Sequence, residues 1–223
     1  MHYFAIYHRH FERFRERPVT VVEFGVSHGG SLQMWRSYFG SRSGIVGVDI
    51  DPRCQALEEA GIRIRIGDQE DRTFLRVLAK EVGPIDVVID DGGHTMAQQI
   101  ATFEELYPAL SEEGVFLVED VHTSYWPRYG GGLGRPGTFV EYAKRRVDQL
   151  NAWHSQEADF EVDEFTRTTR SVHFYDSIVV FEKGIVEPPH HEATGTRTLG
   201  TPARVTLTRA ARALARRVRP RRA

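Results

Sequence analysis

Short apolar runs alternate with helix-like segments along most of this sequence, and this alternation constrains the fold more than any other feature. The runs are rich in valine and isoleucine, and in chain order they read VTVVEF, GIVGVDI, IRIRI, IDVVID and GVFLVED. Buried strands of a parallel sheet read as continuous apolar runs, and each strand needs a helical connection to reach the next one. The sequence therefore predicts an α/β fold with a doubly wound, Rossmann-like sheet that is mostly parallel.

The two ends of this region have a different pattern. Residues 1–18 are predicted to form an N-terminal helix that Pro18 ends. The apolar face of this helix carries Phe4, Tyr7, Phe11 and Phe14. Two strand-like stretches near the C-terminus, 160–167 and 172–181, have no helix between them. Because a parallel pair needs a longer crossover, we expect these two stretches to form an antiparallel hairpin.

Composition limits the number of domains and the compartment. A chain of 223 residues that is 40% hydrophobic can bury one substantial core, which predicts one main domain over residues 19–187. The single cysteine, Cys54, excludes an intrachain disulfide framework, and no segment has the pattern of a signal peptide or a membrane span. We therefore expect a cytoplasmic protein.

Residues 188–223 are predicted to be an Arg-rich C-terminal extension. Positions 201–223 hold eight arginines and no acidic residue, so the rest of the chain is acidic. A solvated extension is the simplest interpretation, and a basic amphipathic helix in weak contact with an anionic membrane surface is the alternative. The acidic body argues against nucleic acid as a partner.

Acidic residues follow several of the predicted strands, at the edge of the sheet where open α/β folds bind ligands. The first loop reads EFGVSHGGS, in which Glu23, Gly25 and Ser31 lie between the first strand and the first helix. Glycines in such a loop allow backbone N–H groups to approach a ligand. The loop departs from the dinucleotide motif G-x-G-x-x-G at Ser27, so by itself it is a weak signal.

The second and third strands also end in acid. Asp49 ends the second strand, where a carboxylate commonly accepts hydrogen bonds from ribose hydroxyls. Asp68 and Gln69 follow the third strand. An ordinary strand-to-helix turn does not need such a series of acids, and the series favours a cofactor site.

The fourth and fifth strands end in IDDGGH and VEDVH, which bring more polar side chains to the same edge. Neighbouring strands lie about 4.8 Å apart, so Asp91, His94, Glu119 and Asp120 converge on one small volume. Carboxylates this close repel one another unless a cation neutralises them. Ligation by Asp91, Glu119 and Asp120 selects a hard ion, Mg²⁺ first, with Mn²⁺ or Ca²⁺ as alternatives. The ordinary alternative is that these acids cap the following helices.

Together, the motifs EFGV, GVDID, GDQ, IDDGGH and VEDVHTSYW resemble those of the class I S-adenosylmethionine-dependent methyltransferases. More narrowly, they are similar to the Mg²⁺-dependent sugar O-methyltransferases of macrolide biosynthesis, of the mycinamicin VI 2''-O-methyltransferase type, over residues 19–183. The sequence differs from that family at Gly93, where a serine is expected, and it does not contain the large N-terminal auxiliary region of those enzymes.

The resemblance implies a methyltransferase domain over residues 19–187 that uses S-adenosylmethionine and Mg²⁺. It assigns the methionine end of the cofactor to Glu23, Gly25 and Asp90, the ribose to Asp49, and the adenine region to Asp68 and Gln69, with Ser31 in the same glycine loop. It also points to the same three metal ligands. The implied acceptor is a hydroxyl of a sugar or glycoside, such as a macrolide sugar, a polysaccharide end or a glycolipid, and we expect a homo-oligomer.

A sugar hydroxyl is a poor nucleophile near neutral pH, so we expect it to be activated by the metal and by a base. The predicted general base is His94, because a histidine pKa lies near the operating pH. The glycine-rich loop after the fifth strand contains His122, Tyr125 and Trp126, which with Tyr7 are candidate substrate contacts.

Two other functions remain open from the sequence. An NAD-dependent oxidoreductase on a related Rossmann sheet would explain the glycine loop and Asp49, but it would not explain IDDGGH together with VEDVH. A non-catalytic protein that only binds the cofactor is the second alternative.

Overall fold

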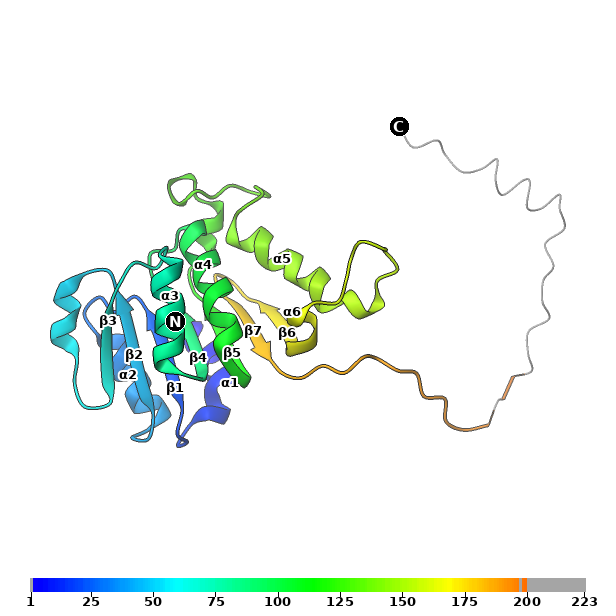
Figure 1. The fold of residues 1–223 in the computed structure, drawn as a ribbon, viewed down its shortest axis with the longest axis horizontal. Helices are drawn as coiled ribbons and strands as arrows, with labels where there is room; N and C mark the ends of the chain where they lie inside the picture. The colour runs from blue at the N-terminus through cyan, green and yellow to red at the C-terminus, as the bar shows by residue number, and fades with distance from the viewer. Residues whose placement is uncertain (1, 197, 200–223) are drawn as a thin grey trace. The chain divides into compact units, whose positions relative to one another are not determined.

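A seven-stranded sheet forms the centre of the first of two structural units, Met1–Pro188, in the computed structural model, which describes residues 2–196, 198 and 199. The strand order is β3-β2-β1-β4-β5-β7-β6, as Figure 1 shows. The strands are β1 Thr20–Phe24, β2 Gly44–Asp49, β3 Ile62–Ile66, β4 Ile85–Asp90, β5 Leu110–Val118, β6 Thr169–Phe174 and β7 Val179–Lys183. Pairing is parallel from β3 to β5 and antiparallel at β7 and β6, which confirms the predicted doubly wound, mostly parallel sheet with a C-terminal hairpin.

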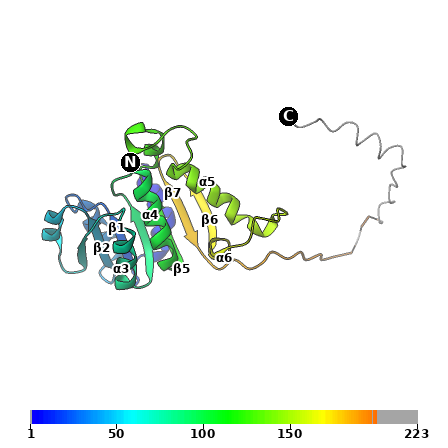
Figure 2. The ribbon, with the colours of Figure 1, turned by 45° about the horizontal axis from the view of Figure 1, so that its top comes forward.

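Helices cover both faces of this sheet, and Figures 1 and 2 show α3 and α4 in front of it. The helices are α1 Tyr3–Phe11, α2 Gly30–Phe39, α3 Arg72–Val82, α4 Met96–Leu106, α5 Phe139–Leu150 and α6 Glu164–Thr168. Successive side chains of a strand point to opposite faces. Val21 and Val87 accordingly pack with α1 and α2, whereas Val22 and Val88 pack with α3, α4 and α5. Burial on both faces explains why these strands read as continuous apolar runs.

The register of the parallel strands sets the position of the functional edge. Phe24 at the end of β1 pairs with Val48 of β2 and with Asp90 of β4, and Asp90 pairs with Val118 of β5. The next residue in each segment therefore lies at the same level, at the carboxyl edge of the sheet. These residues are Gly25, Asp49, Asp91 and Glu119.

The hairpin lies later in the chain than predicted. The stretch 160–167 contains a loop and the start of α6, and the predicted strand 172–181 contains the turn between β6 and β7. Asp163 begins α6 because its carboxylate accepts a hydrogen bond from the Thr166 N–H at 2.9 Å. The turn after β6 is made by Ser177, which has a positive φ of 66°.

Two predicted helices are also shorter than expected. α1 ends at Phe11 and continues only as a 3-10 helix, Glu12–Phe14, so Pro18 is not its end. The segment after β2 is a 3-10 helix, Pro52–Leu57, and not an α-helix. Gly61, with a φ of 87°, turns the chain into β3 soon afterwards and leaves little room for a longer helix.

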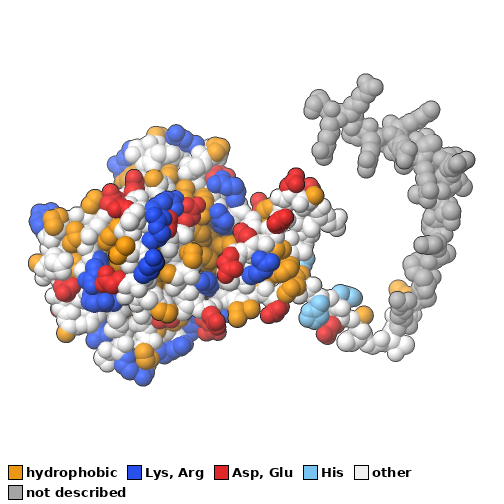
Figure 3. Space-filling model, in the orientation of Figure 1, with side chains coloured by type: hydrophobic (Ala, Val, Ile, Leu, Met, Phe, Trp, Pro, Cys, Tyr) orange, Lys and Arg blue, Asp and Glu red, His pale blue; other side chains and the backbone are white. Residues whose placement is uncertain are grey.

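Oppositely charged side chains lie next to each other over α3 and α4, as Figure 3 shows. Arg72 donates hydrogen bonds to Glu104 and Glu105, and Arg76 donates one to Glu105. Surface ion pairs of this kind stabilise a fold by at most about 1 kcal/mol each. These ion pairs therefore add little to the stability of the fold.

The second unit, Pro189–Ala223, contains almost all of the predicted Arg-rich extension. Its amphipathic segment, residues 201–223, lies outside the described residues. Within the part of the chain that the structure describes, no helix is both long enough and apolar enough to cross a membrane.

Candidate active site

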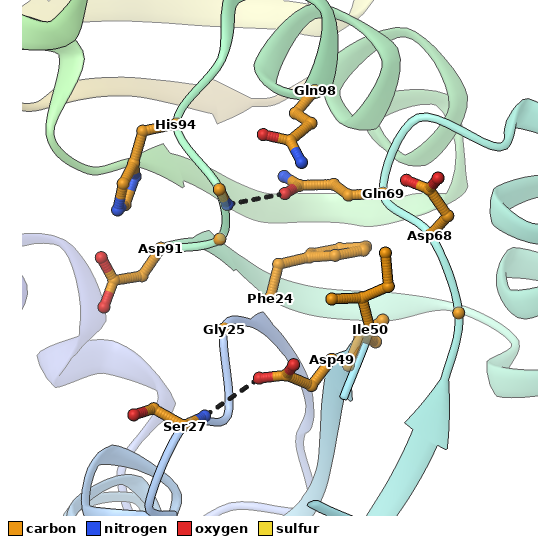
Figure 4. A pocket seen from close by; sticks show the side chains of 14 residues that line it. Phe24, Gly25, Ser27, Asp49, Ile50, Asp68, Gln69, Asp91, His94 and Gln98 are labelled. Carbon is orange, nitrogen blue, oxygen red and sulfur yellow. Dashed lines mark hydrogen bonds between the residues drawn. The ribbon is translucent and has the colours of Figure 1, made fainter. Parts of the chain in front are cut away.

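A cavity of about 410 Å³ lies at the carboxyl ends of the parallel strands, as the position of the motifs predicts. Figure 4 shows this cavity from close by. Its lining includes Gly25, Asp49, Asp68, Gln69, Asp91 and His94. The same cavity thus extends from the predicted cofactor residues to the first predicted metal ligand.

Gly25 brings two walls of the cavity into direct contact. Its φ is +92°, and a Cβ at this position would lie 2.0 Å from the backbone oxygen of Asp91. Its N–H donates to the Val48 carbonyl at 2.9 Å. Only glycine fits both the conformation and the space, so the loop after β1 lies directly against the loop after β4.

Asp49 holds the glycine loop through its carboxylate. It accepts hydrogen bonds from the backbone N–H groups of Val26 at 2.9 Å, Ser27 at 3.0 Å and Asp51 at 2.9 Å, of which Figure 4 draws the Ser27 bond. Partial burial works against the charged form, but the three N–H donors outweigh it and lower the pKa of Asp49. Asp49 is therefore a fixed anion that lines the cavity at the predicted ribose position.

Gln69 lines the cavity, and its amide also contacts the end of β4 and the loop after it. Its Nε2 donates to Asp90 Oδ1 at 2.5 Å, and its Oε1 accepts from the Gly93 N–H at 3.1 Å (Figure 4). A Cβ on Gly92 would lie 2.1 Å from that same Oε1. The Gln69 amide thus holds the loop after β4, whereas Asp68, the other residue of this pair, also lines the cavity.

Two fully buried carboxyl groups, Glu23 and Asp90, lie behind the cavity wall. Burial raises the pKa of Glu23 to about 7, although Trp35 Nε1 and Ser31 Oγ donate to it at 2.7 and 2.9 Å and oppose the shift. Burial also raises the pKa of Asp90 to about 6, and its Oδ2 has no hydrogen-bond partner among the described residues. An unpartnered buried carboxylate oxygen fits a cationic group of a ligand.

The metal end of the cavity brings three of the predicted residues together. Ligand atoms of Asp91, His94 and Asp120 all lie within 4.8 Å of one another. Burial raises the pKa of Asp91 to about 7, and the charges of Asp120 and Asp90 act in the same direction. This cluster is electrostatically strained as long as nothing positive lies in it, and a divalent cation would relieve the repulsion.

Glu119 is next to this cluster but lies outside its tightest group. It is 6% exposed, and its Oε1 accepts a hydrogen bond from the Tyr7 hydroxyl at 2.6 Å. Burial raises the pKa of Glu119 to about 8, and the Asp91 charge adds to the shift. Of the three predicted ligands, Asp91 lines the cavity, Asp120 lies within 4.8 Å of Asp91, and Glu119 lies nearby with a tyrosine bound to its carboxylate.

His94 adopts a left-handed backbone conformation with a φ of 57°. Its Nε2 lies 3.8 Å from Asp120 Oδ2, and its Nδ1 is buried without a hydrogen-bond partner among the described residues. Burial lowers the pKa of His94, the nearby Asp120 raises it, and His122 lowers it further. The net lowering favours a neutral imidazole that can accept a proton near neutral pH.

The loop after β5 begins with a 3-10 helix, η4 Val121–Tyr125, and carries the predicted aromatic contacts. Tyr125 is 48% and Trp126 is 41% exposed, and the His122 ring packs edge-on against Trp126 at 4.5 Å. Tyr7 differs from these residues, because it is buried and its hydroxyl contacts Glu119. A substrate contact by Tyr7 stays a prediction, and in the structure its hydroxyl is bound to Glu119.

Sequence reasoning missed Tyr3 and Trp35. The Tyr3 hydroxyl donates to Asp120 Oδ1 at 2.7 Å, and the Trp35 indole donates to Glu23. A signal for Tyr3 was present, because Tyr3 and Tyr7 are four residues apart on one helix and therefore lie on one face. Nothing in the spacing of Trp35 distinguishes it from an ordinary core residue.

Comparisons with known proteins give a consistent result. Residues 22–121 match the protein-family model described as "Methyltransferase domain". The chain is 41% identical over 191 residues to the 8-demethyl-8-alpha-L-rhamnosyl tetracenomycin-C 2'-O-methyltransferase of Streptomyces olivaceus, which covers 81% of this chain and 50% of that protein. It is 35% identical over 199 residues to the mycinamicin VI 2''-O-methyltransferase of Micromonospora griseorubida, with 82% and 49% covered.

A solved structure of the MycE methyltransferase from the mycinamycin biosynthetic pathway, in complex with Mg and SAH, is also similar. Its TM-score is 0.75 at 35% identity, and the match covers 81% of this chain and 49% of that chain. The chain therefore spans about half the length of the relatives it matches.

Proposed function

We propose that this chain, a class I methyltransferase by sequence and fold, transfers a methyl group from S-adenosylmethionine to a hydroxyl of a sugar or glycoside with the help of Mg²⁺. The observation that carries the proposal is that one cavity extends from Asp49 to Asp91 and His94, which belong to the cluster of carboxylates and histidine. Methyl transfer needs this continuity, because the cofactor and the acceptor oxygen must meet in line.

The residues of the cavity fit S-adenosylmethionine. Asp49 would accept hydrogen bonds from the ribose, and Gly25 would let the cofactor lie close to the backbone of the loop after β1. The unpartnered Asp90 Oδ2 supports a cationic group nearby, such as the ammonium of the methionine end. S-adenosylmethionine itself supplies the reactive methyl carbon, so the protein has to bind, orient and exclude water.

The carboxylates at the other end fit a hard divalent cation. Asp91, Glu119 and Asp120 offer oxygen ligands only, and the pKa values of Asp91 and Glu119, about 7 and 8, reflect crowding of negative charge in a buried place. A bound Mg²⁺ would supply positive charge that lowers the pKa of an acceptor hydroxyl. The three side chains would hold the ion next to the cavity.

His94 is the group that would accept the proton of the acceptor hydroxyl. Its neutral imidazole lines the cavity beside Asp120, and Thr123 Oγ1 fixes the loop by donating to the His94 backbone carbonyl at 2.9 Å. A base so placed contributes about 10² to 10⁴ to the rate. The exposed Tyr125 and Trp126 are suitable for stacking on a sugar face.

The acceptor is proposed to be a glycoside, and the names of the relatives support this class. One relative acts on an L-rhamnosyl tetracenomycin-C and another on mycinamicin VI. A polysaccharide end or a glycolipid headgroup presents similar neighbouring hydroxyls and belongs in the same test.

The test is release of S-adenosylhomocysteine over a panel of glycosylated polyketides, oligosaccharides and glycolipids, with and without EDTA. We expect turnover with at least one glycoside and none after removal of the metal. Calorimetry with S-adenosylmethionine and with NAD separates the alternatives, since binding of NAD alone would favour the oxidoreductase. Binding of S-adenosylmethionine with no turnover on any acceptor would favour a non-catalytic protein.

A further inference from the structure

Helix α1 places two tyrosines on the metal end of the cavity. The Tyr7 hydroxyl donates to Glu119 Oε1 at 2.6 Å, and the Tyr3 hydroxyl donates to Asp120 Oδ1 at 2.7 Å. The two tyrosines are four residues apart, so one helical face contacts both carboxylates of the pair after β5. The two hydrogen bonds join parts of the chain that lie more than a hundred residues apart.

The far end of α1 is fixed independently of these tyrosines. His10 is 2% exposed, and its Nδ1 and Nε2 lie 2.9 Å from Glu182 Oε1 and 2.9 Å from the Tyr175 hydroxyl. Arg13 donates to the same Glu182 oxygen at 3.2 Å. Although His10, Glu182 and His173 are close enough to hold a metal, protein partners already engage both His10 nitrogens and Glu182. This cluster therefore anchors α1 to β6, β7 and the turn between them.

Two aromatic neighbours hold the ring of Tyr7. It packs edge-on against Trp35 at 5.0 Å and stacks on Phe11 at 6.0 Å between ring centroids. Phenylalanine would keep both aromatic contacts and lose only the hydroxyl. The substitution Tyr7→Phe therefore isolates the hydrogen bond to Glu119.

We propose that Tyr7, with Tyr3 beside it, is a positioning residue that fixes the carboxylates of Glu119 and Asp120 for the divalent cation. This inference rests on the proposed function. Each hydroxyl occupies one carboxylate oxygen and leaves the other for the ion. Hydrogen bonds that orient metal ligands are typically worth 10- to 100-fold in metal affinity. Tyr7 has the larger expected effect because Glu119 is buried, whereas the Asp120 side chain is 33% exposed.

The test is Mn²⁺ binding by the full chain, measured from the electron paramagnetic resonance signal of free Mn²⁺, since Mn²⁺ takes the same oxygen ligands as Mg²⁺. Tyr7→Phe should weaken binding by about 10- to 100-fold. The matched control is Tyr107→Phe, because Tyr107 is also buried and its hydroxyl lies 2.7 Å from Thr169 Oγ1, away from the cavity. This control should bind Mn²⁺ as the unmodified chain does.

The following results would contradict the positioning role of Tyr7. Unchanged Mn²⁺ affinity in Tyr7→Phe would show that the tyrosine does not position the ligand, and tighter binding would show that it competes with the ion for Glu119. Equal losses in Tyr7→Phe and Tyr107→Phe, with matching drops in melting temperature, would mean that the effect is general destabilisation. If the unmodified chain binds no Mn²⁺, the metal site itself is wrong and both proposals fail.

Discussion

The two ends of the cavity use acidic side chains in opposite ways. At the cofactor end, Asp49 accepts three backbone N–H groups, and its pKa is lowered. At the metal end, Asp91 and Glu119 lie close to other carboxylates, and burial raises the pKa of both. A carboxylate that protein donors satisfy needs no ion, whereas a crowded and buried one does. Donors within the protein therefore satisfy Asp49, whereas a bound cation would relieve the repulsion at Asp91 and Glu119.

Removal of the metal should have the largest effect, and it tests whether the two ends of the cavity bind their ligands independently. EDTA followed by dialysis should abolish turnover, and added Mg²⁺ should restore it, because the proposed ion lowers the pKa of the acceptor hydroxyl. S-adenosylmethionine affinity should change little, since Asp49 is held by the backbone alone. Calorimetry and an S-adenosylhomocysteine assay on the same sample measure both effects. Full turnover without metal, or loss of cofactor binding along with it, would show that the two ends are not independent.

Substitution of His94 should separate the proposed proton acceptor from the proposed metal ligands. His94→Ala removes a base but no predicted metal ligand, so turnover should fall by about 10² to 10⁴. Mn²⁺ and cofactor affinities should stay near those of the unmodified chain. The comparison variant is Asp91→Ala, which should lose Mn²⁺ affinity as well as activity. If His94→Ala weakens Mn²⁺ binding as much as Asp91→Ala does, His94 is a ligand, as its place within 4.8 Å of Asp91 and Asp120 would allow.

Substitution of Asp49 tests whether this carboxylate contributes to binding of the cofactor. Asp49→Ala should weaken S-adenosylmethionine binding by about 1.5 to 3 kcal/mol, the value of hydrogen bonds to a charged group. Asp49→Asn keeps the size of the side chain and should recover part of the loss. Titration calorimetry measures both variants. Unchanged affinity in Asp49→Ala would remove this residue from the cofactor site and leave it only the role of holding the loop.

The sequence predicted the strand ends well and the contacts between distant segments poorly. The alternation of apolar runs predicted where β1 to β5 lie along the chain, because each buried strand is a local feature of the sequence. It misplaced the hairpin, because the turn at Ser177 depends on a positive φ at a residue that is not glycine. The use of Gln69 to hold Asp90, and of Tyr3 and Tyr7 to hold Asp120 and Glu119, needs the tertiary structure. Spacing within one segment carries no information about such contacts.

The pH dependence of metal binding should show the same contrast between Asp49 and the crowded carboxylates. Without metal, the raised pKa values of Asp91 and Glu119, about 7 and 8, mean that protons remain bound near pH 6 and leave as the pH rises to 8. An ion binds the deprotonated carboxylates and must displace these protons, so Mg²⁺ affinity should rise with pH across this window, by roughly tenfold per unit for each proton released. The contribution of Asp49 to cofactor binding should not change over the same range, because its lowered pKa keeps it ionised throughout.

Calorimetric titration of Mg²⁺ at pH 6, 7 and 8 measures the slope, and repetition in two buffers of different ionisation enthalpy counts the released protons. A flat Mg²⁺ affinity with no proton release would mean that the carboxylates are already ionised without the metal. The crowding of Asp91 with Asp120 would then be relieved by solvent, and the difference between the two ends of the cavity would lie in the hydrogen bonds alone.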